Sequence, residues 1–372
     1  MRGNILSIQI GRAVAATLVL FAHLSFTYGQ ILPPGVGFDI PGFLYFGYSG
    51  VDLFFVVSGY IISHIIAGRF HLQDFVLRRV IRILPFYMFF TAVFVSARAA
   101  FGKSFNLDVS YVLRSILALP LQEAPALGVG WTLEHEFIFY FLVAVVLTLA
   151  GRAVLMPALA GLFAAGVAVH VLLPASTGVQ VWDLHAFSLF QFQFLVGVFI
   201  YQGQKRLRSI GIAAPILIGV LGVCLTAAYL SVPNGSTDRV SIYPIGLDGL
   251  IRVVGYGVSW GFVVSGLLNA EPALRRAHAA GSKAVFMLCL IGDASFALYL
   301  SHPLVLLAFG RLYRKLDIGL ALLDPALALA LLAAVASAVV FLLLVERPFL
   351  RFSHTALPIL LPHTSPMASK TS

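Results

Sequence analysis

Long apolar runs, separated by short polar segments, dominate the chain. Ten of these runs are long enough to cross a bilayer as a helix, because a spanning helix needs about 20 mostly apolar residues. They fall at residues 5–27, 43–67, 83–101, 131–150, 153–173, 185–203, 211–232, 247–268, 285–310 and 319–345. The pattern predicts an all-α fold, a polytopic transmembrane bundle of about ten helices, in which residues 1–352 form one integral membrane domain.

Two segments outside these runs have patterns of their own. Within the loop 102–130, apolar residues recur at helical spacing over 109–119, which predicts a short helix lying at the membrane surface. The C-terminal segment 353–372 is rich in Ser, Thr, Pro and His, so we expect a disordered cytoplasmic tail. No internal repeat of fixed period is evident, which disfavours a transporter built from duplicated halves.

The composition excludes a soluble globular protein. Hydrophobic residues make up 60% of the chain and charged residues only 10%, whereas ordinary domains are about 25% charged. The two cysteines, Cys224 and Cys289, both lie in apolar runs. They can form neither a disulfide framework nor a recognisable metal site, so we expect no bound metal.

The net charge of +9 could indicate nucleic-acid binding, but cationic loops retained on the cytoplasmic side explain it better. If both termini are cytoplasmic, the cytoplasmic segments carry fifteen Lys and Arg and the opposite side carries seven. A cluster of Arg311, Arg314 and Lys315 on the opposite side runs against this trend. The count predicts cytoplasmic termini, an extracytoplasmic 102–130 loop and no nucleic-acid partner.

The first apolar run, ILSIQIGRAVAATLVLFAHLSF, contains two basic residues, Arg12 and His23. A cation at membrane depth is costly in free energy. A separation of eleven residues returns to nearly the same side of a helix, with a rise of about 16 Å. The two residues therefore form one polar stripe, which we interpret as lining an active site. The run lacks an Ala-x-Ala cleavage site, so we expect a retained first helix rather than a signal peptide.

Further polar residues fall inside apolar runs at a similar predicted depth. Such residues are functional candidates when a partner can be named. With His23 they come from five different runs, and they are Asp52, Glu136, Asp248, Arg252 and His302. Their convergence predicts a shared cavity that opens toward the outside of the membrane.

Each of these residues also has a purely structural interpretation. Asp52 could pair with Arg12 or Arg252 and simply hold the bundle together. Glu136 lies near the predicted interface and could be solvated. The two histidines could bond to neighbouring helices or to the backbone, since a proline at 303 frees a carbonyl group close to one of them.

The run FVLRRVIRILPFY brings Arg78, Arg79 and Arg82 to the cytoplasmic foot of the predicted helix 83–101. Arg78 and Arg82 share a helix face at i,i+4 spacing. Guanidinium groups match the geometry of phosphates, so this cluster suits a phosphate-bearing ligand. The alternative is an electrostatic anchor beside anionic lipid headgroups. Glu346 ends the last apolar run, and we expect it to pair with cytoplasmic arginines.

Six motifs occur together along the chain. They are Arg12 with His23 eleven positions on, GVDLFFVVSG, RRVIRILPFY, WTLEHEFIFY, GDASFALYLSHP and VERP. In this order they resemble the membrane-bound acyltransferase-3 family, which O-acylates sugars of surface and exported polysaccharides. GWTLEHEFIFY is most similar to the exopolysaccharide and succinoglycan-type O-acetyltransferases. The resemblance covers residues 5–350, and Phe296 departs from it because the family more often has Tyr there.

The resemblance implies roles for the matching residues. The catalytic group would be His23, Arg12, Asp52, Glu136 and His302; the donor would contact Arg78, Arg79, Arg82 and Ser58; the acceptor would contact Trp131, Arg252 and Tyr299. The donor would be acyl-CoA, most simply acetyl-CoA, with no permanently bound cofactor. We expect a multi-pass protein of the bacterial cytoplasmic membrane, without a fused soluble esterase-like domain, that works alone or with polysaccharide assembly proteins.

In this interpretation the arginines hold the nucleotide phosphates of the donor and its arm reaches along the stripe toward His23. His23 would act as general base on a sugar hydroxyl, or carry the acyl group transiently. Either Asp52 or Glu136 would orient the imidazole, and the sequence does not choose between them. A transporter or flippase for a glycan or an acyl donor is the competing function, since it too would need polar residues around a central cavity.

Overall fold

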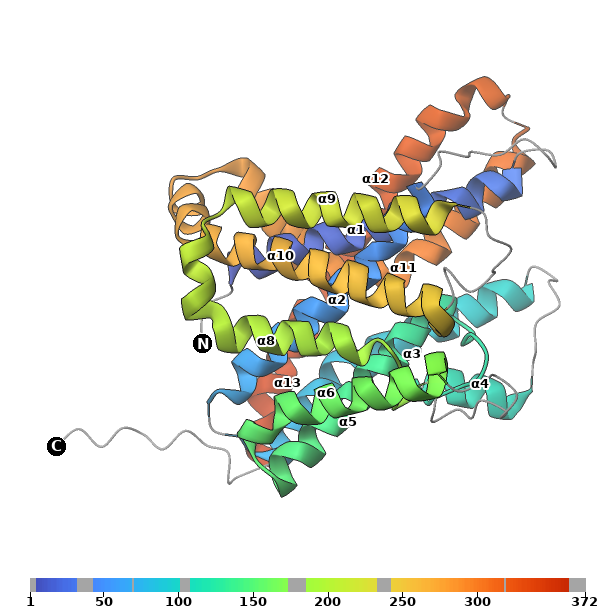
Figure 1. Cartoon of the computed structure of the whole chain (residues 1–372). Coiled ribbons are helices and arrows are strands. Elements are labelled where there is room, and N and C mark those ends of the chain that lie inside the picture. The colour runs from blue at the N-terminus through green and yellow to red at the C-terminus, as the bar shows by residue number, and fades with distance from the viewer. Residues whose placement is uncertain are drawn as a thin grey trace.

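The computed structural model describes residues 5–31, 43–68, 70–100, 108–172, 185–232, 242–317 and 319–360. Across these ranges every regular element is helical, and nine helices are long and apolar enough to span a membrane. Figure 1 shows the long helices running roughly side by side, with α4 and the α8–α9 connection at opposite ends of the bundle. The all-α, multi-pass fold expected from the hydropathy pattern is confirmed.

The principal helices are α1 (Leu6–Ile31), α2 (Phe43–Ile66), α3 (Leu72–Ala100), α4 (Val109–Ile116), α5 (Trp131–Leu149), α6 (Leu155–Val167), α8 (Gln191–Leu207), α9 (Ala213–Ser231), α10 (Gly246–Ala279), α11 (Lys283–Lys315), α12 (Leu323–Phe341) and α13 (Arg347–Leu360). A π-helical turn, Ala168–Leu172, extends α6, and a second one, Leu342–Glu346, joins α12 to α13.

Nine of the ten predicted runs coincide with the nine described helices that are long enough to span a membrane. The predicted and observed helices differ in where they begin and end. The run 185–203 becomes α8, which has 17 residues and begins at Gln191, because residues 186–190 form turns instead. Helix α3 begins eleven residues before the predicted position, so the arginine cluster lies within it rather than at its foot. The segment predicted as a disordered tail starts as helix, since α13 reaches Leu360; residues 361–372 lie outside the described part.

The short surface helix predicted within the loop 102–130 is α4. Asp108 caps its first turn, because the carboxylate accepts a hydrogen bond from the backbone N–H of Tyr111 at 3.2 Å. Val109 and Leu113 of this helix are exposed. An exposed apolar face on a helix of this kind fits contact with the membrane surface.

Helix α1 lies in the interior of the bundle, packed mainly against α2 and α11. Small residues allow this close approach, as is usual between membrane helices. A Cβ atom on Gly50 of α2 would collide with the carbonyl of Ala15, and one on Gly292 of α11 would collide with the backbone of Gln9. These two contacts clamp α1 from both sides near Arg12, so they fix the direction in which its side chain can point.

Replacing Gly292 by Ala therefore tests the packing of α1. The new methyl group has to displace the Gln9 backbone, so we expect the Gly292→Ala variant to lose about 1–3 kcal/mol of stability, as overpacked cores do. Thermal unfolding of the purified protein in detergent measures this as a lower Tm. Gly161→Ala is the matched control, because nothing lies within 4 Å of the new atom. An equal effect of both substitutions would contradict the clamp.

Candidate active site

A cavity of about 540 Å³ lies between α1, α2, α3, α5 and α11, and we call it the central cavity. Its charged and hydroxyl lining is Arg12, Ser58, Arg79, Arg82, Glu136, Tyr140 and Tyr299, together with His64, Thr132 and Ser295. Three guanidinium groups thus face a single carboxylate. This charge balance favours an anionic ligand.

The central cavity extends to Ile5, His64 and Ile65, which lie where α1 begins and α2 ends. By the charge count of the loops this is the end predicted to be cytoplasmic. Of the six residues predicted to share one cavity, only Glu136 lines it, and the side of the membrane to which the cavity opens stays a prediction. Asp52 and Arg252 instead pair with each other, and His23 and His302 lie ring to ring, whereas Arg12, Arg79 and Arg82 line the hollow together with Glu136.

Glu136 is held by two hydroxyl groups inside the central cavity. Ser58 Oγ of α2 donates to Glu136 Oε1 at 2.5 Å, and the hydroxyl of Tyr140 donates to the same oxygen. Tyr140 lies one helical turn after Glu136, at i,i+4 spacing. The guanidinium of Arg79 lies over the Tyr140 ring, 5.9 Å from its centroid. Sequence reasoning missed Tyr140, although its spacing from Glu136 was a signal for it.

Arg12 also points into the central cavity, where its Nη1 donates to Gln9 Oε1 at 3.3 Å. In the described part of the chain it forms no ion pair with a carboxylate. Glu346 is 3% exposed and close enough to Arg12 and Arg82 to interact with them electrostatically. The charge of the Arg12 guanidinium is thus offset by the Glu346 carboxylate without a direct ion pair in the described structure.

Arg78 is the one member of the arginine cluster that does not line the central cavity. Its Nε forms an ion pair with Asp74 Oδ1 at 2.7 Å, and its side chain is 37% exposed. Neighbouring positions on a helix point about 100° apart, so Arg78 and Arg79 cannot face the same way. The expected role of Arg78 in donor binding has no support in this geometry.

His23 and His302 form a pair outside the central cavity. Their ring centroids are 4.7 Å apart in an edge-to-face arrangement. Nδ1 of His23 lies 2.8 Å from the Val19 carbonyl, and Nδ1 of His302 lies 3.0 Å from the Leu298 carbonyl. A carbonyl only accepts, so both Nδ1 atoms donate, and in the neutral imidazole each Nε2 atom then has the lone pair.

One aromatic ring connects this pair to the central cavity. Tyr299 lines the cavity, and its ring centroid is 6.0 Å from that of His302. Its hydroxyl donates to the Val129 carbonyl at 3.0 Å and accepts from Thr132 Oγ1 at 2.9 Å. Arg12 and His23 lie on one flank of α1, as the spacing predicts, but only Arg12 faces the cavity directly.

Asp52 and Arg252 form a buried ion pair rather than part of the cavity wall. Arg252 Nη2 lies 3.6 Å from Asp52 Oδ2, and Gln193 Nε2 donates to Asp52 Oδ1 at 2.5 Å. Asp52 is 0% exposed and Arg252 is 3% exposed. The structural interpretation of Asp52 is therefore the one that the geometry supports. Gln193, a polar residue inside an apolar run, was the signal that sequence reasoning overlooked.

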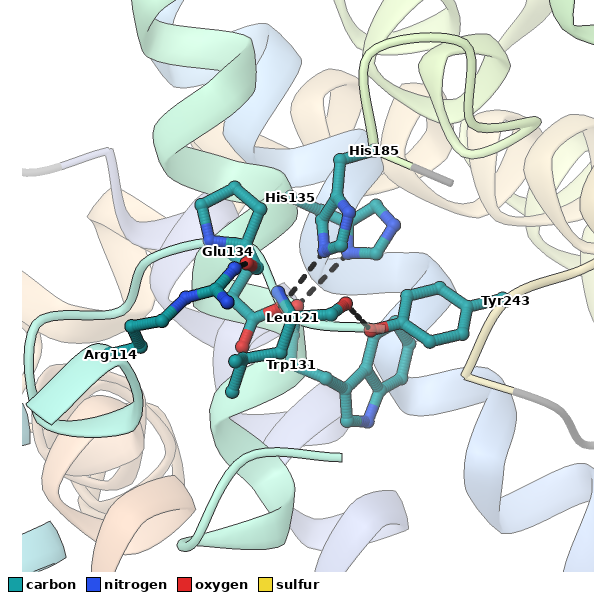
Figure 2. A network of polar contacts seen from close by, with 8 residues as sticks. Arg114, Leu121, Trp131, Glu134, His135, His185 and Tyr243 are labelled. Carbon is teal, nitrogen blue, oxygen red and sulfur yellow. Dashed lines mark hydrogen bonds and ion pairs between the residues drawn. The ribbon is translucent and has the colours of Figure 1, made fainter. Parts of the chain in front are cut away.

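A second polar network, shown in Figure 2, lies at the first turn of α5. His185 Nε2 is 2.9 Å from Glu134 Oε2, and both side chains are 0% exposed. The same oxygen accepts from the backbone N–H of Leu121 at 3.3 Å, and the Tyr243 hydroxyl donates to the Leu121 carbonyl at 2.6 Å. Burial raises the pKa of Tyr243, so this phenol keeps its proton and remains a donor.

This network ties three connecting segments to the first turn of α5. Trp131 belongs to the same face, packed against His135 and against Phe55 and Phe190, and it does not line the central cavity. Figure 2 shows Trp131 and His135 beside the Glu134–His185 pair. The predicted contact of Trp131 with an acceptor is thus not supported. Its ring packs against aromatic side chains beside the network instead.

Comparison with known proteins gives two matches of different kinds. The profile of the family described as an acyltransferase domain matches residues 5–345. The exopolysaccharide production protein ExoZ of Rhizobium meliloti (strain 1021) is 27% identical over 316 residues, which cover 82% of this chain and 90% of that protein. No solved structure matches the chain.

The Asp52–Arg252 pair generates a prediction about stability. Removing one partner of a buried ion pair leaves a buried charge, so we expect Asp52→Leu and Arg252→Met each to cost about 3–5 kcal/mol. The double variant should lose less than the sum of the two, because both charges are gone. Thermal unfolding of all three variants in detergent measures this. Single variants that unfold like the wild type but lack activity would instead assign the pair to the chemistry.

Proposed function

Because the chain belongs to the acyltransferase-3 family, we propose that it is a membrane-bound O-acetyltransferase of the bacterial cytoplasmic membrane, with both termini in the cytoplasm. The acetyl group would come from cytoplasmic acetyl-CoA and go to a sugar hydroxyl of an exported polysaccharide or of its lipid-linked precursor. The relative named for exopolysaccharide production supports this acceptor class. Polysaccharide assembly proteins would be its partners.

The observation that carries the proposal is the cationic central cavity beside a pair of histidines. Arg12, Arg79 and Arg82 face one carboxylate there, which suits the phosphates of a nucleotide thioester. The cavity extends to the end of the bundle that the charge count assigns to the cytoplasm, where acyl-CoA is available. Glu136 with its two hydroxyl partners gives a polar patch suited to the amide groups of the donor arm.

His23 would be the base that activates the acceptor. Its Nδ1–H donates to the Val19 carbonyl, so Nε2 can take the proton of a sugar hydroxyl. The sugar oxygen then forms a bond to the thioester carbonyl carbon, the carbon–sulfur bond breaks, and the imidazolium returns the proton to the leaving thiolate. Arg12 lies about 16 Å back along α1, a distance that an extended donor arm can cover.

Contacts of the histidine pair favour His302, not a carboxylate, as the neighbour that orients His23. Asp52 is bonded to Gln193 and paired with Arg252, and Glu136 is bonded to Ser58 and Tyr140. His302 is 1% exposed, and its Nε2 has no hydrogen-bond partner among the described residues. This atom would accept a proton or a hydrogen bond from the acceptor sugar. The Tyr299 side chain would have to shift for the acyl group to pass from the central cavity to the histidine pair.

Transfer of label from acetyl-CoA to a glycan acceptor tests the function in membranes that contain the protein. We expect ester label on sugar hydroxyls with the wild type, and at least about 100-fold less with His23→Ala, since a general base contributes 10²–10⁴-fold. His278→Ala is the matched control, because this histidine is exposed and lies in the last turn of α10. Equal labelling by wild type and His23→Ala would remove His23 from the chemistry, and label uptake into vesicles without ester would favour a transporter.

The different positions of two arginines give a second test. Arg82 lines the central cavity and Arg78 is paired with Asp74 outside it. We expect Arg82→Ala to raise the KM for acetyl-CoA about tenfold, the effect of one charge-assisted contact to a phosphate, and Arg78→Ala to leave it within about twofold. Steady-state kinetics with both variants measures the difference. A larger effect of Arg78→Ala would contradict the assigned donor site.

A further inference from the structure

A second cavity of about 420 Å³ adjoins the central cavity. It lies between the start of α1 and helices α2, α8 and α10, and its lining includes Tyr60, Gln204, Arg208, Asn269, Glu271 and Arg275. Ile5 and His64 line both cavities, so the two hollows meet at these side chains. Both lie at the end of the bundle where α1 begins.

Tertiary hydrogen bonds build the walls of the second cavity. The Glu271 carboxylate accepts from the backbone N–H groups of Leu6 at 3.2 Å and Ser7 at 2.8 Å, and it forms an ion pair with Arg275 at 2.6 Å. Asn269 Nδ2 donates to the carbonyls of Leu207 at 2.9 Å and Gly211 at 2.7 Å. These two residues flank Arg208, so the asparagine fixes the turn that carries it.

The charge in this cavity is not balanced. Glu271 is its one carboxylate, and that group is already engaged by Arg275 and by the start of α1. Arg208 forms no ion pair with a carboxylate within the described ranges of the chain. A polar hollow with an unneutralised guanidinium at its wall is suited to an anion, and a guanidinium fork is suited to a phosphate.

We propose that the second cavity binds the adenosine end of the donor, with Arg208 contacting its 3′-phosphate. This inference rests on the proposed function, since it divides the acyl-CoA molecule between two hollows. The adenosine and its 3′-phosphate occupy the second cavity, the diphosphate passes Ile5 and His64 toward the arginines of the central cavity, and the arm continues along that cavity. The two hollows, of about 540 and 420 Å³, each fall in the range of small-molecule sites.

The competing explanation for Arg208 is an anchor for anionic headgroups, as for any cationic residue at a membrane surface. Arg206 provides the comparison, because it lies two positions earlier and is exposed like Arg208, but does not line the second cavity. If Arg208 only anchors headgroups, substituting Arg208 or Arg206 should affect ligand binding equally. If Arg208 belongs to a nucleotide site, only its substitution should weaken binding, and only for ligands that carry phosphates.

The test is equilibrium binding of three probes to the full-length protein in nanodiscs: CoA, adenosine 3′,5′-bisphosphate and pantetheine. We expect Arg208→Ala to weaken binding of CoA and of the bisphosphate about tenfold and to leave pantetheine unchanged. Arg206→Ala should bind all three like the wild type, and Arg208→Lys should recover most of the loss. Wild-type protein that binds CoA no more tightly than pantetheine would overturn the proposal, as would equal effects of Arg208→Ala and Arg206→Ala.

Acetyl transfer by the same preparations separates this site from the proposed function. Binding of CoA that depends on Arg208, in a protein that esterifies no sugar, supports the nucleotide site and overturns the proposed function. Acetyl transfer with the same KM for acetyl-CoA in wild type and Arg208→Ala supports the function and overturns the site. Equal unfolding temperatures of Arg208→Ala and wild type confirm that the variant is folded.

Discussion

The guanidinium of Arg12, placed inside a membrane bundle, is the constraint on which the rest of the structure depends. A cation at this depth costs about 2.5–3.5 kcal/mol even on the mildest scales, unless it meets water or a counter-charge. Close glycine contacts with α2 and α11 fix α1 on two sides, so Arg12 faces a polar hollow instead of lipid. The cationic cavity is the direct consequence, because Arg79 and Arg82 of α3 face the same space.

Polar groups in the bundle divide into those that satisfy one another and those that remain available. Asp52 is paired with Arg252 and bonded to Gln193, and all three belong to the packing. The arginines of the central cavity outnumber its carboxylate, and Nε2 of His302 has no partner in the described structure. Groups of the second kind are the ones that a ligand can engage, which is why the proposed chemistry rests on them.

Helix α5 shows how one short motif can both line the central cavity and form a buried structural network. Thr132, Glu136 and Tyr140 recur every fourth residue and line the central cavity, whereas Trp131, Glu134 and His135 face the buried network of Figure 2. The network joins α5 to connecting segments before α8 and α10. Because it fixes the rotation of α5 about its axis, it also holds Glu136 opposite Ser58.

The sequence by itself determined the all-α membrane fold, the surface helix α4, and the shared flank of Arg12 and His23, because hydropathy and the helical period are local properties. It could not distinguish Arg78 from Arg79, or choose between a catalytic and a structural Asp52. Those outcomes depend on the rotation of each helix and on partners far away in the chain, such as Gln193 for Asp52 and Ser58 for Glu136. Only the tertiary structure decided them, since it alone sets which polar groups are paired in the interior and which are left facing a cavity.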